Sequence, residues 1–72
     1  MVNVNKLKGK IVEQGMNVEK LAKKIGIDKS TLYRKLQNEG ESITIKEANL
    51  MIEALQLTAE EAHSIFFHQY VA

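Results

Sequence analysis

The sequence predicts an all-α domain built from five short helices. Apolar residues recur at helical rather than alternating spacing along nearly the whole chain, and runs of β-branched residues are short. The chain has 72 residues and no proline, so we expect one domain over residues 1–72. A chain of this size buries only about 60% of the surface that it exposes when unfolded. Its core is therefore thin, and well-formed helix ends matter for its stability.

Turn and capping residues place the ends of these helices. Gly15 and Gly26 suit left-handed C-terminal positions, while Asn17 and Asp28 suit N-caps. The predicted helices cover about residues 5–14, 18–25, 29–37, 45–55 and 59–69 or 70. Thr44 with Glu47, and Thr58 with Glu61, have the Thr-x-x-Glu spacing of a capping box.

The inner faces of the five helices define the predicted core. Its apolar members are Leu7, Ile11, Val12, Met16, Val18, Leu21, Ala22, Ile25, Ile27, Leu32, Leu36, Ile45, Ala48, Met51, Ile52, Leu55, Ala62, Ile65 and Phe66.

Charge is divided unevenly along the chain. Residues 1–40 hold nine basic and four acidic residues, a net charge of +5, whereas residues 41–72 have a net charge of −4. The formal net charge of +1 hides this difference. A basic first half indicates a surface for a polyanion, although a chance distribution remains open as an explanation.

Residues 17–37 have the features of a helix-turn-helix. Ala22 supplies the small side chain needed where two helices cross closely, and Gly26 permits the left-handed backbone of the turn. The second helix of the pair then keeps one face free, which carries Lys29, Ser30, Tyr33, Arg34 and Gln37. Arginine can donate two hydrogen bonds to guanine, and serine, glutamine and lysine can also reach base edges. This face therefore predicts a DNA recognition helix rather than a solvated surface helix.

The stretch VEKLAKKIGIDKSTLYRKL resembles the helix-turn-helix of phage repressor and Cro-type regulators of the xenobiotic-response-element class. The resemblance covers about residues 5–57 and implies a lambda-repressor-like fold that binds double-stranded DNA. It places Lys29, Ser30 and Arg34 on base-reading positions. With neighbouring lysines included, the expected phosphate contacts are Asn17, Lys20, Thr31, Lys35, Asn38, Ser42, Thr44 and Lys46.

One position departs from the family pattern. Three residues after Leu32 the family usually has an apolar or aromatic residue, but this chain has Lys35, followed by Leu36. We therefore expect Leu32 and Leu36 to anchor the helix at an i, i+4 spacing, which rotates its outer face slightly. Lys6, Lys8 and Lys10 fit a solvated face and extra phosphate contacts equally well.

Three of the four aromatic residues, Phe66, Phe67 and Tyr70, lie within the last seven positions. Adjacent residues on a helix point about 100° apart, so one face cannot bury both phenylalanines. We expect these aromatics to form a homodimer or partner contact. The alternative is that the tail folds back and covers both rings.

Other function classes find little support. Without cysteine there is no disulfide, thiolate nucleophile or Cys-based zinc site, and a reducing cytoplasm fits. We expect no export signal and no membrane span, because no apolar run is long enough. His63 and His68 are five residues apart, so we expect no metal site; we also expect no cofactor, small-molecule ligand or enzyme activity.

Two functions follow from these features. The first is a sequence-specific transcriptional regulator, a phage or prophage Cro-like repressor that occupies operator DNA as a dimer. The second is a protein-interaction modulator that keeps the helix-turn-helix fold but binds a partner repressor.

Overall fold

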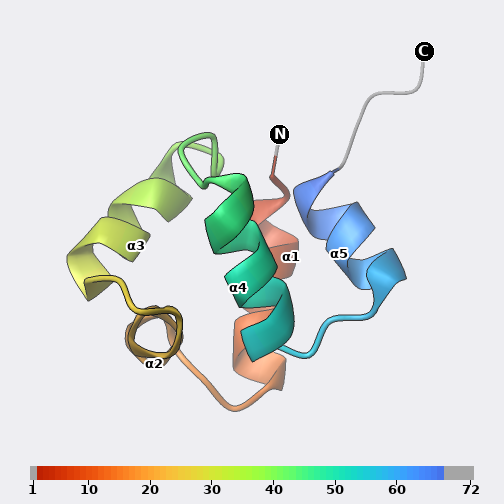
Figure 1. Ribbon diagram of the computed structural model, residues 1–72, viewed down its shortest axis with the longest axis horizontal. Coiled ribbons are helices and arrows are strands. Elements are labelled where there is room, and N and C mark those ends of the chain that lie inside the picture. The colour runs from red at the N-terminus through yellow and green to blue at the C-terminus, as the bar shows by residue number, and fades with distance from the viewer. Residues whose placement is uncertain (1, 68–72) are drawn as a thin grey trace.

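Five helices in the predicted order make up the computed structural model, which describes residues 2–67 (Figure 1). They are α1 (Val4–Glu13), α2 (Val18–Ile25), α3 (Lys29–Gln37), α4 (Ile45–Ala54) and α5 (Ala59–Phe66). The all-α prediction is confirmed, and the described residues contain no strand. None of these helices is long and apolar enough to cross a membrane.

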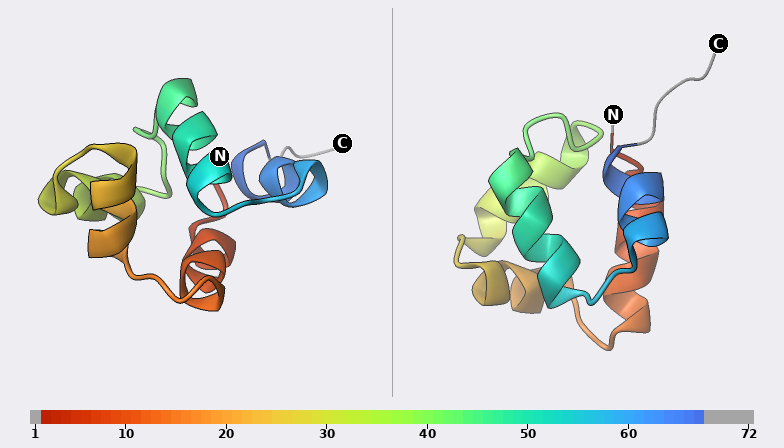
Figure 2. Two further views of the ribbon diagram at one scale, coloured as in Figure 1. Left: turned by 60° about the horizontal axis from the view of Figure 1, so that its bottom comes forward. Right: turned by 45° about the vertical axis from the view of Figure 1, so that its right-hand side comes forward.

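The helices form two sides of one small globule. In Figure 1, α3 runs across the view while α2 is seen nearly end-on, so these two helices cross steeply. Both pack on one side of the molecule, where α2 lies against α3 and α4. On the other side α5 packs beside α1, and α4 stands between the two pairs (Figures 1 and 2). This arrangement leaves α3 at the outer edge, far from α5.

Local capping explains why the helices begin and end where they do. The Asn17 side chain accepts a hydrogen bond from the Lys20 backbone N–H at 2.8 Å, and both predicted capping boxes are formed. Gly26 has φ +82°, and the Ile27 N–H returns to the Ala22 carbonyl at 3.0 Å. The 6→1 hydrogen bond with a left-handed glycine is a Schellman ending, which permits the tight turn into α3.

Two predicted core residues are wrong. Val12 and Ile45 have 73% and 74% of their surface exposed, although they lie on helices with well-buried neighbours. Val12 is next to Ile11 and so points about 100° away from the buried stripe of α1. Ile45 stands in the first turn of α4, whose buried stripe begins only at Ala48.

The remaining core follows the predicted pattern. Its buried apolar residues are Leu7, Ile11, Leu21, Ala22, Ile25, Leu32, Leu36, Ala48, Met51, Leu55, Ala62, Ile65 and Phe66. Met16, Val18, Ile27 and Ile52 are half-buried against it.

The last helix ends earlier than predicted. Phe67 has φ −119° and ψ 29°, so α5 stops at Phe66 rather than at residue 69 or 70. The carbonyl of Ile65, in the last turn of α5, accepts a hydrogen bond from the Asn3 N–H at 2.8 Å, which ties the start of the chain to this helix end. Residues 68–72, which include Tyr70, lie outside the described part of the chain.

Candidate nucleic-acid interface

The start of α3 is fixed by Asp28. Its side chain accepts hydrogen bonds from the Ser30 backbone N–H at 3.1 Å and from the Ser30 hydroxyl. These two bonds hold the pKa of Asp28 below its ordinary value, and the bond from the hydroxyl has the larger effect. An ionised carboxylate can only accept hydrogen bonds, so the Ser30 proton is committed to Asp28. The free lone pairs of Ser30 can therefore accept a hydrogen bond from an external donor.

Leu32 and Leu36 anchor the inner face of α3. They are 0% and 4% exposed, which confirms the expected i, i+4 anchoring. The five residues predicted to read bases are all exposed on the remaining surface of the helix, and half of the Tyr33 side chain is accessible. These residues are Lys29, Ser30, Tyr33, Arg34 and Gln37.

The first turns of α2 and α3 lie close together. The Lys29 ammonium is 3.4 Å from a carboxylate oxygen of Glu19, and both side chains are more than half exposed. Such an exposed pair contributes about 0 to 1 kcal/mol. Lys29 can therefore exchange Glu19 for another anion at little cost. The contact also places Asn17 and Lys20, at the start of α2, on the side of the molecule where α3 begins.

Lys35 has a different environment from the other predicted phosphate contacts. Its ammonium donates to both carboxylate oxygens of Glu47, at 2.7 and 2.8 Å, and to the carbonyl of Ser42 at 3.2 Å. Only 16% of the Lys35 side chain is exposed. We therefore remove Lys35 from the expected phosphate contacts, because its charge is already paired inside the fold. A lysine between Leu32 and Leu36 was the signal in the sequence, since a charge near the core needs a partner.

The other expected phosphate contacts follow α3 into α4. Asn38 is the C-terminal cap of α3, and Ser42, Thr44 and Lys46 are exposed in the loop and in the first turn of α4. Thr31 is half-buried. Apart from Thr31, these side chains present donors to solvent around the same end of α3.

The two phenylalanines of α5 have separate environments. Phe66 is 7% exposed and belongs to the core, whereas Phe67 is 45% exposed. Burial withdraws the Phe66 ring from any partner, so we remove it from the expected contact surface. Phe67 lies 6.5 Å from the His63 ring, centre to centre, in a tilted arrangement. The split between neighbouring rings is the one that helical geometry predicts.

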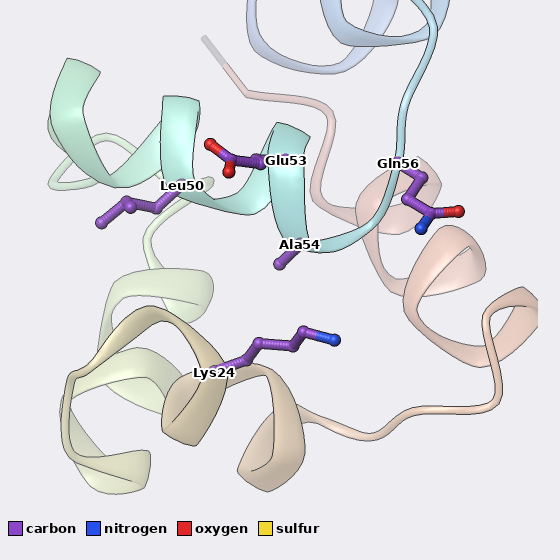
Figure 3. A pocket seen from close by; sticks show the side chains of 5 residues that line it. All are labelled: Lys24, Leu50, Glu53, Ala54 and Gln56. Carbon is purple, nitrogen blue, oxygen red and sulfur yellow. The ribbon is translucent and has the colours of Figure 1, made fainter.

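A shallow pocket of about 310 Å³ lies elsewhere, between the end of α2 and α4 (Figure 3). Its lining contains none of the predicted site residues. The ammonium of Lys24 and the carboxylate of Glu53 lie apart on its two walls. The lining residues are Lys24, Leu50, Glu53, Ala54 and Gln56. The predicted DNA contacts therefore lie outside this pocket.

A steep α2–α3 pair with a left-handed glycine turn, an anchored inner face and a polar outer face defines a helix-turn-helix DNA-binding domain. The family model of the Cro/C1-type HTH DNA-binding domain matches residues 6–64. The chain belongs to this family. No curated protein and no solved structure gives a significant match to it.

Proposed function

We propose that this protein is a sequence-specific transcriptional regulator that reads operator DNA with the outer face of α3. The observation that carries this proposal is the division of α3 into a buried inner face and five exposed polar side chains, none of which the core uses. In helix-turn-helix proteins the N-terminal residues of the second helix reach the base edges in the major groove.

Each exposed residue has a chemical role in this proposal. Arg34 donates two hydrogen bonds to the O6 and N7 atoms of guanine, and Gln37 pairs with adenine. Ser30, whose proton goes to Asp28, accepts from an exocyclic amine of adenine or cytosine. Lys29 leaves Glu19 for a base or phosphate, and Tyr33 offers an apolar edge with a hydroxyl.

Phosphate contacts supply most of the affinity. Asn17 and Lys20 bind one strand from the start of α2, and residues 38–46 bind the backbone beyond the end of α3. Each neutralised phosphate contributes about −0.9 to the slope of log affinity against log salt concentration. The protein would act in the cytoplasm as a Cro-like repressor of phage or prophage type, blocking polymerase by occupancy.

A homodimer fits this role. Two recognition helices about 34 Å apart meet successive major grooves on one face of DNA. The exposed ring of Phe67 is the apolar group that we assign to the subunit contact. A palindromic operator follows from such a dimer.

The same exposed ring supports a second candidate function, in which the protein binds a partner repressor and modulates it. The two functions use different faces of the molecule, because α5, whose C-terminal cap is Phe67, lies on the opposite side from α3 (Figure 1). Phe67→Ala would then abolish partner binding, and Arg34→Ala would leave it intact.

Selection from a random duplex library at physiological salt tests the leading proposal. We expect the folded protein to enrich a two-part, palindromic motif. Arg34→Ala should lose about 1–3 kcal/mol of discrimination at one or two base pairs. Lys24→Ala removes the same charge at the pocket and serves as the control, with its motif unchanged. Retention of no motif by folded protein would overturn the proposal.

A further inference from the structure

The ion pair between α3 and α4 lies directly beneath the proposed interface. Lys35 and Glu47 are 16% and 14% exposed, and the ammonium meets both carboxylate oxygens at 2.7 and 2.8 Å. Lys35 follows Arg34 in sequence but points the other way, toward α4. The pair therefore joins the back of the recognition helix to the next helix.

Glu47 has a second task at the same time. It is the third residue of the α4 capping box, and its Oε1 accepts from the Thr44 N–H at 2.9 Å. The Thr44 hydroxyl accepts in turn from the Glu47 N–H at 3.0 Å. Lys35 also donates to the carbonyl of Ser42 at 3.2 Å. One lysine thus holds α3, the end of the α3–α4 loop and the first turn of α4.

The α3–α4 loop, residues 38–44, also packs against the fold, because Gly40 is buried beside Val2 and Ile43 is half-buried against the core. Two short turns close it, through Glu41 N–H to the Asn38 carbonyl and Ile43 N–H to the Gly40 carbonyl, both 3.1 Å. Two consecutive residues, Glu39 and Gly40, have φ of 55° and 71°. These turns and the apolar contacts of Gly40 and Ile43 shape the loop and seat it on the core. Lys35 adds the polar link between α3 and this segment, through the Ser42 carbonyl and the Glu47 carboxylate.

We propose that Lys35 and Glu47 are positioning residues for DNA binding. Their ion pair holds the α3–α4 loop and the first turn of α4 beside α3, so that the phosphate contacts of this segment keep a fixed distance from the base-reading face. This inference rests on the proposed function. It replaces the direct phosphate contact that the sequence predicted for Lys35.

The two roles for Lys35 make opposite predictions for Glu47. If Lys35 bound phosphate directly, the Glu47 carboxylate would compete with DNA for it, and Glu47→Gln would tighten binding. If the pair positions the loop, Glu47→Gln weakens binding as Lys35→Met does. Glutamine is accepted at the third position of a capping box, so this change removes the charge and keeps the cap.

The experiment measures the dissociation constant of the selected duplex for wild type, Lys35→Met, Glu47→Gln and the double variant. All binding is measured under conditions in which circular dichroism shows that each protein is folded. We expect each single variant to bind about tenfold more weakly, which corresponds to about 1.4 kcal/mol and is within the coupling that contacting residues show. The double variant should lose no more than either single one. Amide hydrogen exchange at residues 41–44 should become faster in Glu47→Gln.

The control is Glu61→Gln. Glu61 is the matching residue of the α5 capping box, and this change removes the negative charge that pairs with Lys10. It should lower the melting temperature and leave the dissociation constant unchanged. An unchanged dissociation constant in Glu47→Gln, or tighter binding, would overturn the positioning role while the wild-type motif stands. A wild-type protein that enriches no motif would overturn the proposed function and this inference with it.

Discussion

The molecule uses the same device at two junctions, between α3 and α4 and between α1 and α5. In each, a lysine from the earlier helix pairs with the glutamate that closes the capping box of the later helix. At one junction Lys35 meets Glu47, and at the other Lys10 meets Glu61. The first pair joins the proposed recognition helix α3 to α4, and the second joins α1 to α5, which lie on the opposite side of the molecule from α3 (Figures 1 and 2).

The two ion pairs differ in how deeply their glutamates are buried. The Glu47 side chain is 14% exposed, while Glu61 is 30% exposed. Burial acts to raise the pKa of Glu47, and hydrogen bonds from Lys35 and the Thr44 N–H outweigh it, so this pKa is lowered. At Glu61 the hydrogen bond from Lys10 is the largest influence, and it lowers the pKa to about 2. The more exposed pair, Lys10 with Glu61, joins α1 to α5. The more buried pair, Lys35 with Glu47, joins α3 to α4 and also contacts the loop that DNA would touch.

The largest expected difference is in stability, between a glycine substitution in the α3–α4 loop and one in α1. A Cβ added at Gly40, in the α3–α4 loop, would lie 2.6 Å from the Cβ of Val2, and the backbone there has φ +71°. Gly40→Ala should therefore destabilise the protein by about 3 kcal/mol, through left-handed strain and overpacking. Gly9→Ala, in the exposed interior of α1 where nothing lies within 4 Å, should stabilise it by about 0.5–1 kcal/mol. Urea unfolding measures both.

Equal effects of the two glycine variants would contradict this view of the α3–α4 loop. The loop would then be free to move away from Val2, and its fixed position would lose support.

Acid unfolding should distinguish the two glutamates. A lowered pKa stabilises the fold above the ordinary value of 4.5, and this stabilisation is lost as the pH falls through the folded value, about 2 for Glu61. Glu61→Gln should therefore flatten the dependence of stability on pH between about 4.5 and 2. Glu47→Gln should flatten it less, because burial opposes the lowering at that site.

Denaturant midpoints measured across this pH range check the prediction. The pKa of Lys10 is raised, mainly by its bond to Glu61, so its stabilisation is present below 10.5 and lost at higher pH. Lys10→Met should remove the alkaline dependence and weaken the acid one, because the Thr58 N–H still lowers the pKa of Glu61. A steeper acid profile in Glu61→Gln than in wild type would contradict the assignment.

The smallest effects concern single surface lysines. Lys46→Ala, in the first turn of α4, should reduce the magnitude of the salt slope for DNA binding by about 0.9 and weaken all sequences alike. Lys8→Ala, on α1, should leave the slope unchanged if that face is only solvated. Titrations at several salt concentrations decide between the two uses of the α1 lysines. A changed slope for Lys8→Ala would extend the interface onto α1.

Local signals made the helices predictable from sequence. Asp28, Asn17 and the two Thr-x-x-Glu boxes act within one turn, and Gly26 sets its own backbone, so none of them depends on distant residues. The outer face of α3 was predictable for the same reason, because Leu32 and Leu36 define the inner face of the helix.

Features that depend on which helix ends meet were not predictable. The pairing of Lys35 with Glu47 requires knowing that α4 begins beside the last turn of α3. The hydrogen bond that ties the start of the chain to the end of α5 joins Asn3 and Ile65, which are 62 positions apart in the sequence. Ile45 lies in the apolar pattern of α4, but only the packed structure shows that no core lies beneath the first turn.

Sequence discrimination by α3 is most directly measured as a ratio of affinities. The wild-type protein is titrated against its selected duplex and against a scrambled duplex of the same composition, at physiological salt. Base reading by α3 predicts that the selected duplex binds about a thousandfold more tightly or better, as specific operator binding does. A ratio near one would contradict it, because phosphate contacts alone do not distinguish the two sequences.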